Sequence, residues 1–183
     1  MDLIVESGLA SSNGETKKMI LRDFIKEDAE IIAGWLKTED DLYRWSADRF
    51  NKFPLYGEDI NQSYEPQKES GRFIPLTMVD EDGKVSGHFI IRYPKEDDDS
   101  TVRFGFVIVD PEIRGKGLGR EMLRLGIEYV KTIPGVKRID LGVFENNPVA
   151  MSCYEAVGFK EYATRLCEMP IGTWNCIDME IFI

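Results

Sequence analysis

The amino-acid sequence predicts a single α/β (α+β) domain built on a mixed β-sheet with helices on both faces. The chain has 183 residues, the length of one ordinary domain, and 43% of them are hydrophobic, which is enough for a substantial core. Strand-like and helix-like segments follow one another in an order that is neither a strict βαβ repeat nor an all-β meander. We expect residues 19–183 to form this domain and residues 1–18 to be an N-terminal leader.

The first half of the domain is predicted to start with one strand and one helix. Residues 19–24 are a short apolar run that suits a strand. Four apolar side chains then recur on one helical face between residues 29 and 36, after an acidic first turn. Residues 38–72 show no clear period, although one short helix is expected after Tyr56. Because the stretch is rich in aromatic residues, we expect a functional loop or lid rather than a linker.

The second half of the domain alternates more regularly. Strands are predicted at residues 73–79, 85–93, 102–109, 138–144, about 159–169 and 175–183. A glycine-rich stretch opens a helix whose apolar face begins at Leu118. A second helix is expected between Pro148, a residue favoured in the first helical turn, and Gly158, a residue favoured after the last.

Composition and charge exclude several functional classes. The sequence has no run of roughly 18 to 20 apolar residues and no basic-then-apolar N-terminus, so we expect a cytoplasmic protein without a membrane partner. With 33 acidic against 23 basic residues, the net charge of -10 disfavours nucleic acid. The spacing of Cys153, Cys167 and Cys176 fits neither a zinc site nor a disulfide framework, so we expect reduced thiols and no metal.

The most informative segment is the glycine-rich turn at residues 114–120, Arg-Gly-Lys-Gly-Leu-Gly-Arg. It lies between a predicted strand and an amphipathic helix. Glycines let backbone N–H groups come close to a ligand, and a helix N-terminus adds partial positive charge. Arg114, Lys116 and Arg120 add three cations in a chain of net charge -10. The turn therefore suits a phosphate or pyrophosphate.

Two common phosphate-binding motifs do not match this turn. A P-loop needs a serine or threonine after its lysine to bind magnesium, but Gly117 follows Lys116. A dinucleotide-binding fingerprint needs a longer last interval than the one between Gly117 and Gly119. The pattern that remains is Arg-x-x-Gly-x-Gly at residues 114–119.

This pattern resembles the acyl-CoA-binding motif of the GNAT superfamily of N-acetyltransferases. Residues 147–159, Asn-Pro-Val-Ala-Met-Ser-Cys-Tyr-Glu-Ala-Val-Gly-Phe, are similar to the second conserved segment of that superfamily. The resemblance covers roughly residues 19–183, and its opening strand and acidic helix start resemble the branch of ribosomal-protein N-terminal acetyltransferases. It implies a mostly antiparallel central sheet in which a parallel pair, residues 102–109 and 138–144, splays apart to form the acyl-CoA cleft.

The resemblance also implies which residues hold acetyl-CoA. Those matching the superfamily motifs are Val107, Ile108 and Val109 for the pantetheine arm, Arg114, Gly115, Lys116, Gly117, Leu118, Gly119 and Arg120 for the pyrophosphate, and Asn147 near the amide portion. Tyr154 matches the tyrosine that protonates the departing thiolate. A core aromatic role for Tyr154 and a purely capping role for Asn147 are the structural alternatives.

The general base is the least defined part of the predicted site. Where related enzymes carry a glutamate, this sequence has Gly142. Glu145, near the same strand end, is the preferred substitute, and a solvated position is its alternative. His88 has a suitable intrinsic pKa but lies on a predicted central strand, where a satisfied structural histidine is the commoner outcome. A water chain is the third option.

The predicted activity is transfer of acetyl from acetyl-CoA to a primary amine of a small molecule, peptide or protein, by direct attack. The net charge and the composition of the lid suit a cationic acceptor; the lid residues that suggest it are Trp45, Asp48, Tyr56, Glu58 and Asp59. Members of the superfamily are often homodimers, so a homodimer is a further expectation. The rivals are a noncatalytic acyl-CoA-binding sensor with the same fold and, from a third class, a nucleotide-dependent enzyme.

Overall fold

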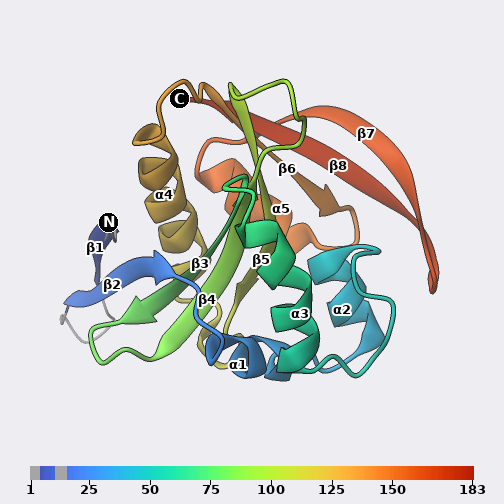
Figure 1. Cartoon of the computed structure of the whole chain (residues 1–183), viewed down its shortest axis with the longest axis horizontal. Coiled ribbons are helices and arrows are strands. Elements are labelled where there is room, and N and C mark those ends of the chain that lie inside the picture. Colours follow the sequence, from blue (N-terminus) through green and yellow to red (C-terminus); the bar gives the residue numbers. More distant parts are fainter. Residues whose placement is uncertain (1–4, 11–15) are drawn as a thin grey trace.

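The computed structural model describes residues 5–10 and 16–183 as one sheet with helices on both faces (Figure 1). The strands are β1 (Val5–Ala10), β2 (Thr16–Asp23), β3 (Phe73–Asp80), β4 (Val85–Arg92), β5 (Thr101–Val109), β6 (Arg138–Phe144), β7 (Lys160–Met169) and β8 (Gly172–Phe182). The helices are α1 (Asp28–Gly34), α2 (Glu39–Ser46), α3 (Gly57–Lys68), α4 (Leu118–Lys131) and α5 (Pro148–Ala156). The eight strands lie in the order β1-β2-β3-β4-β5-β6-β8-β7.

The sheet is antiparallel except at β5 and β6, which confirms the predicted parallel pair. These two strands are paired at only three positions, from Thr101 opposite Arg138 to Arg103 opposite Asp140. Beyond Arg103, β5 has no ladder partner on the β6 side, so the strands diverge. The divergence opens a cleft at the C-terminal ends of the two strands, as the resemblance implies.

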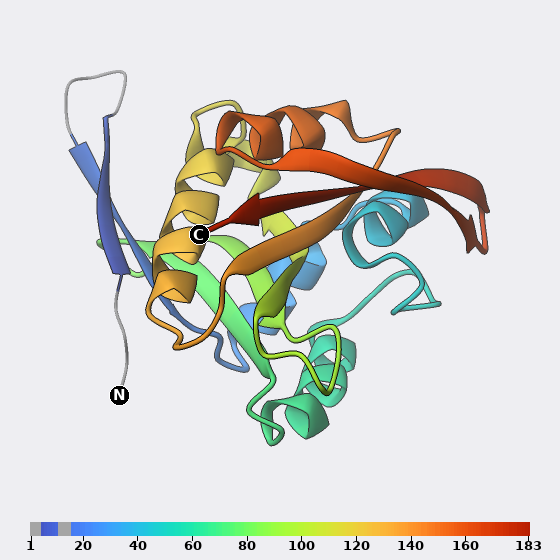
Figure 2. The same cartoon turned by 90° about the horizontal axis from the view of Figure 1, so that it is seen from above.

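Helices cover both faces of the sheet (Figure 2), and a hydrophobic core forms beneath the helices on each face. Helices α4 and α5 cover one face, where their apolar side chains pack on alternate residues of β4, β5, β6 and β8. Helices α1, α2 and α3 cover the other face over β3, β4 and β5. Because side chains alternate along a strand, β3, β4 and β5 contribute residues to both cores.

The region expected to be irregular contains two helices rather than one. Helix α3 is the predicted one, whereas α2 was not predicted. Thr38 begins α2 with a capping box: its side chain accepts from the Asp41 N–H at 3.1 Å, and Asp41 Oδ2 accepts from the Thr38 N–H at 3.1 Å. The prediction of a loop there was wrong because this local signal was hidden among scattered charges and aromatic residues.

The N-terminal segment also differs from expectation. Strand β2 begins at Thr16 rather than at residue 19, and β1 lies within the segment that was assigned to a leader. β1 pairs antiparallel with β2 from Val5 opposite Leu21 to Ala10 opposite Thr16. Residues 5–10 therefore extend the sheet at the β2 edge. Across the described residues, no helix is both long and apolar enough to cross a bilayer.

Candidate active site

A cavity of about 880 Å³ lies in the cleft where β5 and β6 diverge. Its walls come from the end of β5, the glycine-rich turn and the start of α4. The two residues that follow α1, one face of α2, and α5 with its N-cap complete them. The lining residues are Trp35, Leu36, Asp41, Arg44, Trp45, Val107, Ile108, Val109, Arg114, Gly115, Gly117, Leu118, Gly119, Arg120, Leu123, Asn147, Pro148, Val149, Ala150, Ser152, Cys153 and Tyr154. Of the residues predicted to hold the cofactor, Lys116 alone is absent from this wall, and its side chain is exposed.

The glycine-rich turn has the backbone conformation of an anion-binding loop. Gly115 and Gly117 have φ of 79° and 82°, a left-handed region that favours glycine. Gly117 is the N-cap of α4, so the first N–H groups of that helix have no partner within it and face the cavity end lined by Arg114 and Arg120. This end suits a pyrophosphate because it combines backbone N–H donors, the positive end of the helix dipole and two guanidinium groups.

A bulge in β5 shapes the middle of the cavity. Phe106 has φ of 53°, and the register with β4 shifts by one residue there. Its carbonyl accepts the indole N–H of Trp45 at 2.7 Å, which fixes α2 against β5. Residues 107–109 follow the bulge and line the cavity, and no strand of the described chain pairs with their outer backbone edge, where the Val109 carbonyl accepts from Arg114 Nε at 3.3 Å. An extended chain such as pantetheine fits beside such an edge as an added strand.

Tyr154 and Asn147 reach the cavity from α5. Burial raises the pKa of Tyr154 above its ordinary value, so the hydroxyl keeps its proton at neutral pH, as a proton donor requires. Asn147 is the N-cap of α5 and accepts from the Ala150 N–H at 3.3 Å. Both side chains line the cavity, so the capping role of Asn147 and the packing role of Tyr154 leave each of them able to contact a ligand there.

The two predicted bases lie outside the cavity wall. Glu145 is exposed and accepts a hydrogen bond from Asn175 Nδ2 at 2.8 Å. His88 is fully buried under α3, where its Nε2 lies 2.9 Å from the Tyr64 hydroxyl. Burial lowers the pKa of His88 to about 3, against the smaller opposite effects of the Leu76 carbonyl and of Asp28. The structure therefore does not bring either residue to the cavity.

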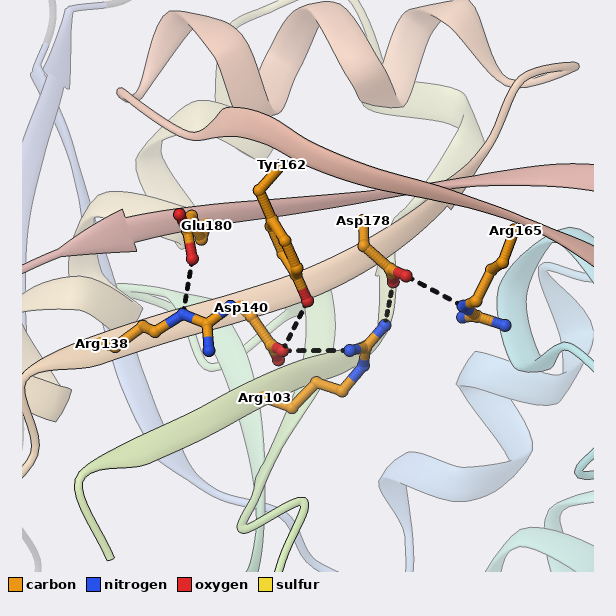
Figure 3. A network of polar contacts seen from close by, with 7 residues as sticks. All are labelled: Arg103, Arg138, Asp140, Tyr162, Arg165, Asp178 and Glu180. Atoms are coloured by element: carbon orange, nitrogen blue, oxygen red, sulfur yellow. Dashed lines mark hydrogen bonds and ion pairs between the residues drawn. The ribbon is translucent and has the colours of Figure 1, made fainter. Parts of the chain in front are cut away.

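Position 142 is closed to a side chain by an ionic network on the α1–α3 face of the sheet (Figure 3). A Cβ atom on Gly142 would lie 2.8 Å from Arg103 Nη2, 3.0 Å from Cys176 Sγ and 3.2 Å from Asp178 Oδ1. Arg103 bridges Asp140 and Asp178, with Nη1–Oδ2 at 3.1 Å and Nη2–Oδ1 at 2.7 Å. A glutamate at position 142 therefore requires the side chains of this network to shift.

One end of the cavity wall is formed by the α1–α2 corner. Trp35, Leu36, Asp41, Arg44 and Trp45 line it. Of the lid residues expected to meet an acceptor, Trp45 is confirmed in the wall, whereas the other four are not part of it. Sequence reasoning missed the rest of this end because it did not place α2; the Thr38–Asp41 capping pattern is the signal that identifies the helix and its inward face.

The cavity wall has no metal-binding character. Within residues 5–10 and 16–183, no group of three or more histidine, cysteine, aspartate or glutamate side chains is arranged to hold a metal ion. Cys153 lies in the wall beside Gly119, and burial raises the pKa of its thiol. The three cysteines are free thiols.

Comparison with known proteins agrees with this geometry. The spermine/spermidine N(1)-acetyltransferase of Bacillus subtilis (strain 168) is 31% identical over 108 residues, which are 57% of this chain and 71% of that protein. Two solved structures share the fold: spermidine N-acetyltransferase from Vibrio cholerae in complex with CoA and spermine, and ribosomal-protein-S5-alanine acetyltransferase from Vibrio fischeri. The first has a TM-score of 0.75 at 19% identity, covering 90% of this chain and 95% of that one. The second has a TM-score of 0.71 at 15% identity, covering 90% and 92%.

At these identities the two structures establish the fold alone. The family match is more specific, because it spans both segments that carry the resemblance, the glycine-rich turn and residues 147–159. Residues 39–159 match the family described as acetyltransferase (GNAT) family. The chain therefore belongs to the acetyltransferase (GNAT) family.

Proposed function

We propose that this acetyltransferase transfers the acetyl group of acetyl-CoA to the primary amine of a small molecule. The observation that supports the proposal is that the cationic glycine-rich turn, Tyr154 and the α1–α2 corner all line one cavity. A donor held at the turn would place its thioester near Tyr154. An amine that enters at the other end would meet that thioester inside the same space.

Each wall of the cavity has a task in this reaction. Arg114, Arg120 and the first N–H groups of α4 bind the pyrophosphate, and the free edge of residues 107–109 orients the pantetheine arm. As the amine nitrogen bonds to the acetyl carbon, the carbon–sulfur bond breaks and Tyr154 gives its proton to the departing thiolate. The attacking amine must have lost one proton before the bond forms and loses another afterwards.

The acceptor class is supported by a relative. The Bacillus subtilis relative is named for spermine and spermidine, which are small-molecule amines. A peptide amine as acceptor, a homodimer and a cytoplasmic location stay predictions from the sequence.

The test is a measurement of acceptor-dependent thiol release from saturating acetyl-CoA. The panel holds monoamines, diamines, spermidine, amino acids and a short peptide with a free N-terminus. We expect turnover with at least one small amine. Binding of acetyl-CoA without acceptor-dependent release from any of them would support the noncatalytic sensor instead.

The donor end is tested by the double variant Arg114→Gln/Arg120→Gln. Since hydrogen bonds to charged groups are worth about 1.5–3 kcal/mol each, the KM for acetyl-CoA should rise at least about tenfold. Arg124→Gln is the matched control, because Arg124 is 60% exposed on α4 and pairs with Glu121 outside the cavity wall. An equal effect of both changes would indicate a general loss of positive charge rather than a site.

A further inference from the structure

The acceptor end of the cavity carries one positive and one negative side chain from the same helix. Asp41 and Arg44 both line the wall. They are three residues apart on α2, a spacing that puts their Cβ atoms about 5–6 Å apart on one helix face. In the described part of the chain no ion pair joins them to each other, so the wall presents two separate charges.

Both side chains keep free hydrogen-bonding capacity. Asp41 uses Oδ2 to accept from the Lys37 and Thr38 N–H groups, and among residues 5–10 and 16–183 no hydrogen bond engages its Oδ1. Arg44 donates from Nη2 to Asp40 at 3.2 Å, while its Nε is buried without a partner in the described residues. Asp40 is 55% exposed, and a surface pair of this kind is worth little, so it leaves the Arg44 charge available to a ligand.

The remaining wall at this end is apolar. Trp35, Leu36 and Trp45 line it, and the indole N–H of Trp45 is already used by the Phe106 carbonyl. These side chains exclude water from the two charged groups, which strengthens their attraction for an opposite charge. An ammonium group is therefore favoured beside Asp41, whereas a second ammonium near Arg44 meets a like charge.

We propose that the acceptor is an amino-acid-type molecule, in which Asp41 binds the amine and Arg44 binds a carboxylate of the same molecule. This inference rests on the proposed function and names its substrate class. It separates this chain from the polyamines in the names of its relatives, since a polyamine offers Arg44 only positive groups. A guanidinium group matches the planar carboxylate with two parallel hydrogen bonds.

Three probes of equal chain length test this selection: 4-aminobutanoate, butylamine and 1,4-diaminobutane. Each has a primary amine at one end of a four-carbon chain, and the far end is a carboxylate, a methyl group or a second primary amine. We expect kcat/KM to fall in that order, with at least about a tenfold difference between the first and the last. A higher kcat/KM for 1,4-diaminobutane or spermidine would overturn this inference and leave amine acetylation intact. Failure to acetylate any amine would overturn both.

Two pairs of variants assign the effect to these residues. Arg44→Gln should reduce the preference for 4-aminobutanoate about tenfold, and Arg44→Glu should reverse it in favour of the diamine. The control Arg49→Gln removes the same charge from a side chain that is 63% exposed and outside the wall, so it should keep the preference. A preference that is unchanged in Arg44→Gln would contradict the assignment.

The second pair compares two aspartates. Asp41→Asn keeps an oxygen for the capping box but removes the charge, so the KM for every amine should rise about tenfold. Asp48→Asn changes the net charge equally at a position that is 73% exposed and outside the wall, so it should leave the KM as it is. An unchanged KM in Asp41→Asn, with thermal stability matched between the variants, would remove Asp41 from the acceptor site.

Discussion

Arg103 on β5 and Asp178 on β8 form a 2.7 Å ion pair although strand β6 lies between them (Figure 3). The other terminal nitrogen of Arg103 binds Asp140 on β6 at 3.1 Å. Arg103 and Asp140 are also the last register pair of the parallel β5–β6 ladder. The side chain therefore ties three strands together at the point where the cleft begins. Arg165 and Tyr162 complete the network from β7.

Replacement of Arg103 by methionine should destabilise the protein by about 3 kcal/mol. The side chains of Asp140 and Asp178 are only 7% and 9% exposed, and removal of their shared cation leaves two buried carboxylates without full compensation. Burial already raises the pKa of Asp140 despite Arg103, which indicates how costly that charge is. Urea unfolding at pH 7 measures the loss. Arg49→Met, at a 63% exposed position, should change stability by less than about 0.5 kcal/mol.

Gly142→Ala should destabilise the protein by about 1–3 kcal/mol, because the new methyl group would overpack the same network. Gly34→Ala is the matched control at the end of α1, where a Cβ would meet nothing within 4 Å. That substitution should be neutral or slightly stabilising. Equal stability of the two variants would show that the Arg103 network yields to a side chain at position 142, which would reopen this position to a catalytic acid.

His88 should make stability depend on pH below neutrality. Its pKa is about 3 in the folded state and about 6.5 in an unfolded chain, so between these values the unfolded state binds the extra proton. Stability therefore falls as pH falls through this window, by about 1.4 kcal/mol per pH unit. Between pH 7 and pH 5 the wild type should lose about 2 kcal/mol more than His88→Gln. The comparison of pH slopes is insensitive to any constant cost of losing the hydrogen bond with Tyr64, and parallel slopes would disprove the assignment.

Tyr154→Phe should lower kcat about 100-fold while the thermal midpoint shifts by only a few degrees. Because burial raises the pKa of Tyr154, the residue supplies a proton at every pH from 6 to 9, and no inflection from it is expected there. Tyr129→Phe, on α4 outside the cavity wall, is the matched control and should keep kcat. A variant at position 154 with wild-type kcat would leave Tyr154 as a core aromatic only.

The strands and the cofactor end could be predicted because their signals are local in the chain. Periodic apolar residues define β3 to β8, and the three glycines stand next to their arginines within residues 114–120. The acceptor end depends on contacts between distant segments. Trp45 and Phe106, for example, are 61 residues apart in sequence but share a hydrogen bond, and no local pattern encodes that contact.

The two predicted bases lie outside the cavity wall because of the direction of their side chains. His88 has a suitable intrinsic pKa, but strand alternation and the packing of α3 place it beneath Tyr64. Glu145 follows β6 directly, yet its side chain turns to Asn175 on β8. Residue type and strand position were read correctly from the sequence in both cases. The side on which each group emerges was decided by tertiary packing.

The hydrogen bond from Trp45 to the Phe106 carbonyl has a consequence for how this enzyme can change. It joins α2, which carries Asp41 and Arg44, to the strand segment proposed to lie along the donor. A substitution that shifts α2 to admit a new acceptor should also move the wall proposed to hold acetyl-CoA. Acceptor range should therefore diversify through exchange of side chains on a fixed helix, because displacement of that helix would sacrifice donor affinity.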